Sequence, residues 1–138
     1  MIFLLDTNTI SYIINKNRRY RENIRKRIFF ELLSGNDIAF SALNYYEIKR
    51  GLSEVSSEKK ELFERICENY HILLFDDLEI FNKASDIYSN LRRKGELIPE
   101  SDILIASLAM VKGAIVVTHD AHFQRIRGLE TTTFVMND

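Results

Sequence analysis

The sequence is poor in cysteine and has no long apolar run. Its one cysteine, Cys67, has no second thiol in the chain with which to form a disulfide. Because Cys67 falls in a segment with a helical pattern, we expect a small buried side chain in a reducing compartment. No apolar stretch approaches the length of a membrane span, and the N-terminal apolar run is too short for a signal peptide and has no basic region before it. These absences predict a cytoplasmic protein with no membrane anchor.

Charge of one sign is not in excess either. The 19 lysines and arginines stand against 20 aspartates and glutamates, which gives a formal net charge of -1. This balance neither requires nor excludes a nucleic-acid partner, although a nuclease needs a local positive track. The hydrophobic fraction of 46% and the charged fraction of 28% are typical of a globular protein rather than a disordered one. The length suits one compact domain, residues 1–138, and no repeat, low-complexity tract or linker divides it.

What the chain has instead is a series of short apolar runs that alternate with helical patterns. The runs lack strict polar alternation, as strands buried on both faces do. They therefore predict an α/β fold of three layers, with a central parallel sheet covered by helices on both faces. The predicted strands are residues 2–5, 38–40, 72–75, 114–117 and a last one near 133–135.

The segments between these strands have helical patterns of different kinds. Residues 42–52 and 56–68 predict two helices, the first with Ser41 as its N-cap. Residues 100–112 are apolar almost all round, which indicates a buried helix. An apolar stripe at helical spacing predicts an amphipathic helix before the second strand, with a face formed by Ile24, Ile28, Phe29, Leu32 and Leu33.

Acidic residues fall at the positions where a parallel sheet binds ligands. Asp6 directly follows the first strand and Asp120 follows the fourth, and the carboxyl ends of parallel strands meet at one edge of the sheet. Asp102 lies in the first turn of the buried helix. Glu47 comes four residues after Leu43 and so lies on the same side of its helix. Each acid also has an ordinary structural explanation, as a helix cap, a helix-dipole acid or a member of an ion pair.

Taken together, the four acids predict a metal site. Several carboxylates in one crevice repel each other unless a cation joins them. Clusters of oxygen ligands suit the hard ions Mg²⁺ and Mn²⁺. A site of this kind can activate water and hold a phosphate for in-line hydrolysis.

The order of the motifs resembles a known family. Asp-Thr-Asn follows the first strand, Ser-x-x-x-x-x-Glu is followed by Gly51, Asp-x-x-Ile-Ala begins at Asp102, and Thr-x-Asp-x-x-Phe begins at Thr118. In this order, and over nearly the whole chain, the motifs resemble those of the PIN-domain ribonucleases. Within these, the chain is similar to the VapC toxins of bacterial and archaeal toxin–antitoxin systems.

This resemblance implies a PIN-like fold, a Mg²⁺- or Mn²⁺-dependent endoribonuclease activity on RNA, and inhibition by a cognate antitoxin protein. Asn8 and Thr118 would be polar supports that orient carboxylates. The family also suggests a homodimer, and an antitoxin segment laid across a groove near residues 42–52 and 56–68. The catalytic and metal-binding quartet would be Asp6, Glu47, Asp102 and Asp120.

Two positions depart from the family pattern. Asn44 stands three residues before Glu47, where Thr or Ser is often found. His119 precedes Asp120, where many members carry Asn. The first departure bears on the hydrogen bonding around Glu47, and the second on the geometry of the fourth acid.

A basic run from Lys16 to Arg27 could line the rim of the crevice and hold phosphates. Within it, Tyr20 could stack on an unpaired base. The ordinary alternative is a charged helix face. The candidate RNA contacts in this run are Arg18, Arg19 and Arg21.

Two histidines, His119 and His122, flank Asp120. A zinc site made from them would need further nitrogen or sulfur ligands, and Cys67 and His71 sit in unrelated segments. We therefore expect both histidines to lie at the surface or to contact RNA.

Two rival functions remain open. An acid after the first strand can be a phosphoryl-accepting nucleophile, but Asn8 stands where the haloacid-dehalogenase-like motif needs a second Asp. The other rival is a non-catalytic RNA-binding or assembly module on the same fold. The intact acidic quartet argues against it.

Overall fold

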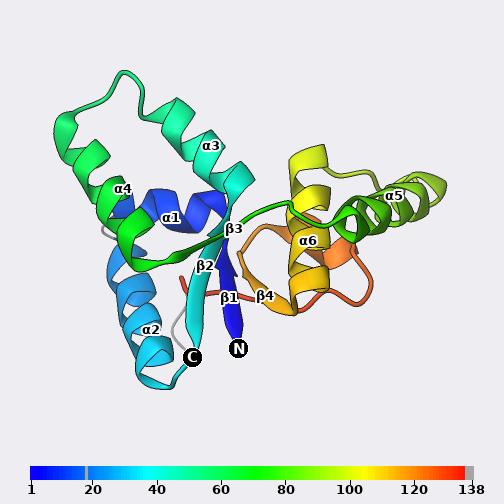
Figure 1. Ribbon diagram of the computed structural model, residues 1–138, viewed down its shortest axis with the longest axis horizontal. Helices are drawn as coiled ribbons and strands as arrows, with labels where there is room; N and C mark the ends of the chain where they lie inside the picture. The colour runs from blue at the N-terminus through cyan, green and yellow to red at the C-terminus, as the bar shows by residue number, and fades with distance from the viewer. Residues whose placement is uncertain (18, 136–138) are drawn as a thin grey trace.

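The architecture is that of a computed structural model, in which residues 1–17 and 19–135 are described. At its centre is a five-stranded sheet in the order β3-β2-β1-β4-β5, and every neighbouring pair is parallel. The sheet puts the N-terminal strand in the middle, as Figure 1 shows. The strands are β1 (Ile2–Leu5), β2 (Asp37–Ser41), β3 (His71–Leu73), β4 (Ala114–Val117) and β5 (Thr131–Thr132).

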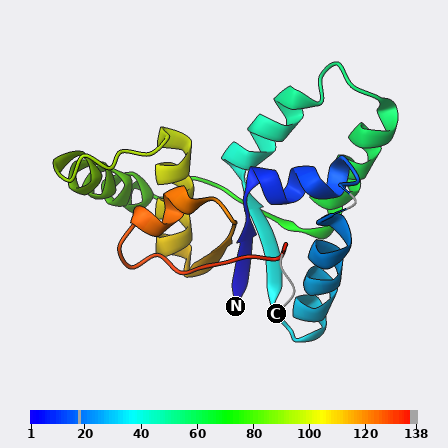
Figure 2. The same cartoon turned by 180° about the vertical axis from the view of Figure 1, so that it is seen from behind.

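Helices cover both faces of this sheet, so the predicted three-layer α/β/α fold is confirmed. Helices α1 to α4 lie on one side and α5 and α6 on the other, as Figures 1 and 2 show from opposite directions. None of the helices in the described part of the chain combines the length and the apolar character that crossing a membrane requires. The helices are α1 (Thr7–Ile14), α2 (Arg21–Leu33), α3 (Ala42–Gly51), α4 (Ser57–Asn69), α5 (Leu78–Arg93), α6 (Glu100–Lys112) and the 3₁₀ helix η1 (Ala121–Arg125).

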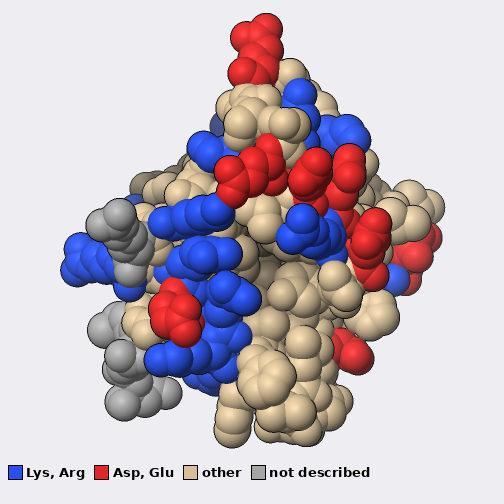
Figure 3. All heavy atoms as spheres, turned by 90° about the vertical axis from the view of Figure 1, so that its left-hand side faces the viewer, with Lys and Arg blue, Asp and Glu red and all other residues tan. Residues whose placement is uncertain are grey.

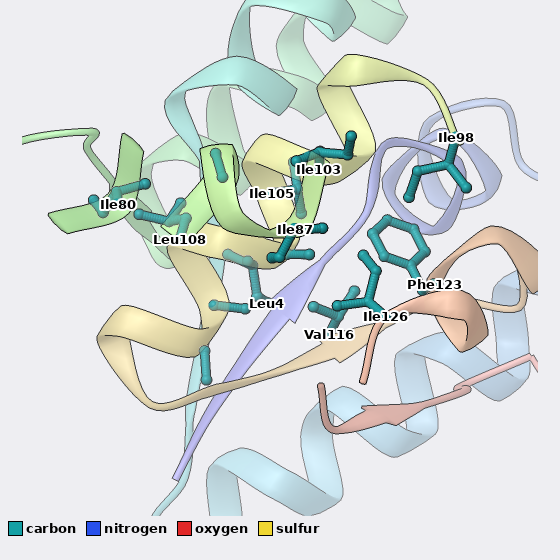
Figure 4. Packing of buried hydrophobic residues seen from close by; sticks show 14 of the residues in the cluster. Leu4, Ile80, Ile87, Ile98, Ile103, Ile105, Leu108, Val116, Phe123 and Ile126 are labelled. Carbon is teal, nitrogen blue, oxygen red and sulfur yellow. The ribbon is translucent and has the colours of Figure 1, made fainter. Parts of the chain in front are cut away.

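Two apolar cores, one on each face of the sheet, hold the layers together. There are two because successive side chains of a strand point to opposite faces. Phe3 and Leu5 of β1 belong to the core under α1, α2 and α4. Leu4 points the other way, into the core under α5 and α6. Figure 4 shows this second core, in which Phe123 of η1 packs beside Ile126. The burial of Phe123 therefore holds the short η1 segment against the sheet.

The strand register brings the ends of the central strands to one edge. Leu5 pairs with Val117, and the Asp6 backbone N–H donates to the Val117 carbonyl at 3.1 Å. Asp6 and Thr118 are thus the first residues beyond two adjacent parallel strands. Helix α3 begins directly after Ser41, at the end of β2. Any group that these segments carry opens onto the same edge.

Two predicted strands differ from the observed ones. The third strand ends at Leu73 rather than at residue 75, and Leu74 is 57% exposed. The last strand is Thr131–Thr132 rather than a segment near 133–135. Phe134 and Val135 are buried, but they pack as loop residues against the core. Phe134 and Val135 show that burial does not require a hydrogen-bonded strand, and Leu74 shows that an apolar run can end in an exposed residue.

The amphipathic prediction for α2 is wrong in its C-terminal half. Ile24 and Ile28 are buried as expected. Phe29 is 65% exposed and Leu33 is 73% exposed. Helical spacing identifies apolar residues that share a side, but the core covers only the first part of that side.

Candidate functional site

A pocket of about 210 Å³ opens at the carboxyl edge of the sheet. It is formed where the ends of β1 and β4 meet the first turn of α6 and one side of α3. All four acids of the predicted quartet line it, together with four other residues; their catalytic roles remain predictions. The lining residues are Asp6, Thr7, Asn8, Glu47, Asp102, Ile105, Asp120 and Phe123.

Asp6 is held in place by the helix that follows it. It is 6% exposed and is the N-cap of α1, with its Oδ1 atom accepting a hydrogen bond from the Thr9 N–H at 2.8 Å. An aspartate at this position satisfies an orphan amide and faces the positive end of the helix dipole. The cap explanation and the metal-site explanation of Asp6 are therefore compatible, because the cap uses only one carboxylate oxygen.

Glu47 is oriented by a chain of hydrogen bonds that runs back to the end of β2. The Thr7 hydroxyl donates to Glu47 Oε1 at 2.9 Å. The same Thr7 oxygen accepts from the Asn44 amide at 2.9 Å, and Ser41 Oγ donates to Asn44 Oδ1 at 2.7 Å. Asn44 is completely buried. The departure from the family pattern at position 44 thus has a structural role, since the amide links the N-cap of α3 to α1.

Asp102 and Asp120 meet around His122. Nδ1 of His122 lies 3.2 Å from Asp102 Oδ2 and 3.3 Å from Asp120 Oδ1. Burial raises the pKa of Asp102, and the negative charges of Asp120 and Asp6 add to that effect, while the hydrogen bond from His122 opposes it. The wall of the pocket thus contains a carboxylate whose ionised form is disfavoured in the metal-free protein.

The two predicted supports have different surroundings. Thr118 is buried, and its hydroxyl oxygen accepts a hydrogen bond from the Asp120 N–H at 2.9 Å. This contact fixes the turn that carries Asp120. Asn8 is exposed and lines the pocket. Asn8 is therefore placed to contact a ligand, whereas Thr118 is placed to orient the backbone.

His122, which was expected to lie at the surface or to contact RNA, has a side chain that is 39% exposed and that also contacts two of the acids. Its backbone N–H donates to Asp120 Oδ1 at 2.9 Å, as part of the cap that starts η1. This tight turn brings the imidazole back over the acids. In the sequence, the only sign of this contact is that His122 follows Asp120 by two positions. That spacing becomes informative only when the 3₁₀ helix η1 is known to begin there.

An aromatic cluster lies beside the acids and was only partly anticipated. The rings of Tyr12 and His119 are nearly parallel, at 12° with centroids 5.6 Å apart, and Tyr20 lies 5.8 Å from His119. The Arg19 guanidinium sits over the Tyr20 ring at 5.1 Å. Burial raises the pKa of Tyr12, and the charges of Tyr20 and Asp6 act in the same direction. This cluster links the basic run to the pocket.

Neither of the other two candidate RNA contacts, Arg18 and Arg21, is among the described residues that line the pocket. Arg18 lies outside the described residues. Arg21 lines a separate hollow of about 360 Å³ between α2 and α4, with Arg25 and Arg65. Figure 3 shows lysines and arginines gathered in a band on this side of the molecule. Arg21 thus belongs to a basic surface between α2 and α4 rather than to the pocket wall.

The donor set of the pocket fits a divalent cation. Asp102, Asp120 and His122 each offer one ligand atom, and these atoms lie within 4.8 Å of one another. Asp6 and Glu47 add two more carboxylates to the lining of the pocket. The raised pKa of Asp102 reflects negative charge that a cation would neutralise.

The fold and this pocket define a class of protein, and the sequence comparison agrees. The PIN domain family matches residues 3–129, and this chain belongs to that family. It is 35% identical over 139 residues to Ribonuclease VapC2 of Rickettsia felis, covering 94% of this chain and 95% of the relative. It is 29% identical to Ribonuclease VapC1 of Haemophilus influenzae strain R2866, over 94% of this chain and 96% of that protein. The family resemblance stated from the motifs is confirmed.

Solved structures show the same fold. VapBC2 from Rickettsia felis bound to a promoter DNA fragment has a chain with a TM-score of 0.81 and 28% identity, covering 96% of this chain and 98% of that one. VapBC-1 from nontypeable Haemophilus influenzae gives a TM-score of 0.85 and 27% identity, covering 99% of this chain and 100% of that one. The similarity therefore extends over essentially the whole length of both proteins.

Proposed function

We propose that this protein is a divalent-metal-dependent endoribonuclease and the toxin of a type II toxin–antitoxin pair. The observation that carries the proposal is the meeting of Asp6, Glu47, Asp102 and Asp120 in one pocket of a PIN-domain sheet. Relatives that cover nearly the whole chain are named ribonucleases, and the similar structures are VapBC assemblies.

In the proposed mechanism, each wall of the pocket has its own task. Asp6, Asp102 and Asp120 would hold the cation, with Asp6 fixed by its cap and Asp120 by Thr118. Glu47 is held by Thr7 so that its carboxylate stays directed into the pocket. A bound divalent ion supplies activation of water and neutralisation of charge on the scissile phosphate.

The proposed RNA path enters along the aromatic cluster. Arg19 is exposed and sits on Tyr20, which contacts His119, the neighbour of Asp120 in the chain. Arginine binds phosphates, and aromatic rings stack on unpaired bases. A strand of RNA bound here would have its backbone led toward the acids. The role of Arg18 stays a prediction, since that residue lies outside the described part of the chain.

The proposed partners are RNA, an antitoxin protein and a second copy of the chain. The antitoxin is supported by the similar solved structures, which are VapBC assemblies. The groove near α3 and α4, and the homodimer, rest on the family resemblance.

The deciding experiment is cleavage of RNA by the purified protein, free of antitoxin. We expect cleavage with Mn²⁺ or Mg²⁺, none with EDTA, and none by the Asp102→Ala variant. Asp86→Ala, on the exposed surface of α5, is the matched control and should cleave normally. RNA binding without cleavage by the folded protein would favour a binding module. A phosphate trapped covalently on Asp6 would favour the aspartyl phosphotransferase.

A further inference from the structure

The histidine that follows Asp120 by two residues lies inside the acid cluster. Its Nδ1 atom is 3.2 Å from Asp102 Oδ2 and 3.3 Å from Asp120 Oδ1. Three features fix it there: the cap from Asp120 Oδ1 to the His122 N–H at 2.9 Å, the Thr118 contact behind that turn, and the burial of Phe123 next in the chain. The imidazole position is thus set by the backbone of η1.

The three ligand atoms have the spacing of neighbours around one ion. Adjacent ligands of an octahedral ion with bonds of about 2.1 Å lie about 3 Å apart. The two distances from Nδ1 to the carboxylates match such an edge, and all three atoms fall within 4.8 Å of each other. The remaining charge in the pocket is negative, from Asp6 and Glu47.

The other histidine of the segment provides a contrast. His119 directs its Nε2 atom to the Tyr12 hydroxyl at 3.3 Å and stacks on that ring. It is exposed and does not belong to the group of possible ligands formed by Asp102, Asp120 and His122. Two histidines three residues apart therefore have different neighbours, one aromatic and one acidic.

We propose that His122 is a ligand of the catalytic ion through Nδ1, so that the site takes a transition-metal ion such as Mn²⁺ in preference to Mg²⁺. The inference rests on the proposed metal-dependent function and deepens it by naming the class of ion. Mg²⁺ binds almost entirely through oxygen and keeps its waters. Imidazole nitrogen is a common ligand of transition-metal ions, so replacing an oxygen by Nδ1 disfavours Mg²⁺ relative to Mn²⁺, while the carboxylates still suit Mn²⁺.

The test is metal binding by the whole protein, without RNA. In pulsed electron paramagnetic resonance of the Mn²⁺-loaded protein, we expect the nitrogen coupling of a coordinated imidazole. The coupling should vanish in His122→Ala and persist in His119→Ala, the matched control. By calorimetry, His122→Ala should weaken Mn²⁺ binding by about 10- to 100-fold, on the scale of a lost metal-site interaction, and change Mg²⁺ binding far less.

His122 is 39% exposed, so the alanine variant is expected to fold; His122→Gln is a second variant that keeps more of the side-chain volume and should give the same losses. Bound Mn²⁺ without nitrogen coupling would overturn this inference alone, as would a coupling that disappears only in His119→Ala. Failure to bind any divalent ion would overturn the metal site and the inference with it. Mn²⁺ bound through His122 in a protein that cleaves no RNA would leave the inference intact and overturn the proposed function.

Discussion

The two walls of the pocket are built in opposite ways. The α1–α3 wall is formed by Thr7 and Glu47, with the buried Asn44 behind them, and is a chain of hydrogen bonds in which each donor described has an acceptor. The α6–β4 wall, made of Asp102, Asp120 and His122, holds two carboxylates about one imidazole nitrogen. The hydrogen bonds of the first wall are made within the chain, whereas the two carboxylates of the second lie close enough together for a cation to offset their charge.

This difference indicates how the work of the site is divided. A carboxylate that is held by neutral hydrogen bonds keeps its direction whether or not a ligand is present. A cluster of like charges is unfavourable until the ion binds, so its affinity for the ion and its stability are coupled. Changes to one wall should therefore affect position, and changes to the other should affect metal binding.

The largest effect is expected at Asp6, which faces both walls. Asp6→Asn should slow RNA cleavage by about 1,000-fold or more, because it weakens binding of an ion that supplies several kcal/mol of catalysis. Thermal unfolding should be almost unchanged, since Asn caps a helix as well as Asp does. Full activity of the purified variant would remove Asp6 from the site. Asp6→Ala, which also loses the cap to Thr9, should lower stability by about 1 kcal/mol.

A smaller loss is expected when the α1–α3 wall is broken. Thr7→Val removes the hydroxyl that joins Asn44 to Glu47, and cleavage should fall by about 10- to 100-fold, as for other groups that orient a metal-site carboxylate. Mn²⁺ affinity should change little. Thr7→Ser keeps the hydroxyl and should retain activity. If Thr7→Val reduced metal affinity as strongly as a change at Asp102, the distinction between the walls would fail.

The negative charge of the α6–β4 wall should lower the stability of the metal-free protein at neutral pH. The pKa of Asp102 is raised above its unfolded value, so the metal-free folded protein binds the proton more tightly than the unfolded chain. Stability from this group is therefore present at low pH and lost as the pH rises through the interval above the unfolded pKa, about 3.9. At neutral pH, metal-free Asp102→Asn should be the more stable protein, by less than about 1 kcal/mol because solvent screens the charge.

Saturating Mn²⁺ should reverse that order. At 100 times the dissociation constant, a ligand stabilises the folded state by about 2.7 kcal/mol, and the variant should gain much less. Thermal melts of the wild type and of Asp102→Asn, in EDTA and in Mn²⁺ and at pH 4 and pH 7, measure the difference in stability under each of the four conditions. A variant that is less stable than the wild type in EDTA at pH 7 would contradict the view that this wall is strained by its own charge.

The smallest effect is expected outside both walls. Arg19→Ala should weaken binding of RNA a few-fold and lower the dependence of log K on log salt by about 1, as loss of one phosphate contact does. Binding is measured with the Asp6→Asn background, so that RNA stays intact. Arg92→Ala, in the last turn of α5, is the control. Equal losses in both variants would mean that the RNA path does not follow the aromatic cluster.

Much of the fold was readable from the sequence, because parallel strands are short apolar runs and their ends carry small polar or acidic residues. The three-layer architecture follows from the alternation of apolar runs with helical patterns, and the meeting of Asp6 and Asp120 at one edge follows from the parallel sheet. The exposed end of α2 was not readable. Phe29 and Leu33 have the same spacing as the buried Ile24 and Ile28, and periodicity does not say how far the covering core extends.

The fine structure of the site also exceeded what spacing can predict. Asn44 reaches Thr7 across 37 residues of sequence, and Asp102 reaches His122 across 20. Contacts of this kind depend on how α1, α3 and η1 are oriented on the sheet. A motif can name the acids, whereas the groups that hold them are found only when the elements are packed.

Asp6 is both the N-cap of α1 and a member of the pocket, and this affects what a mutation at its codon would do. Codons for Asp and Asn differ by one base, and Asn preserves the cap of α1 while it removes the charge from the pocket. Under the proposed function, a single transition in the gene would thus yield an inactive protein that folds as its parent does. Such a protein would still present the parental outer surface and could titrate the partner that restrains active molecules.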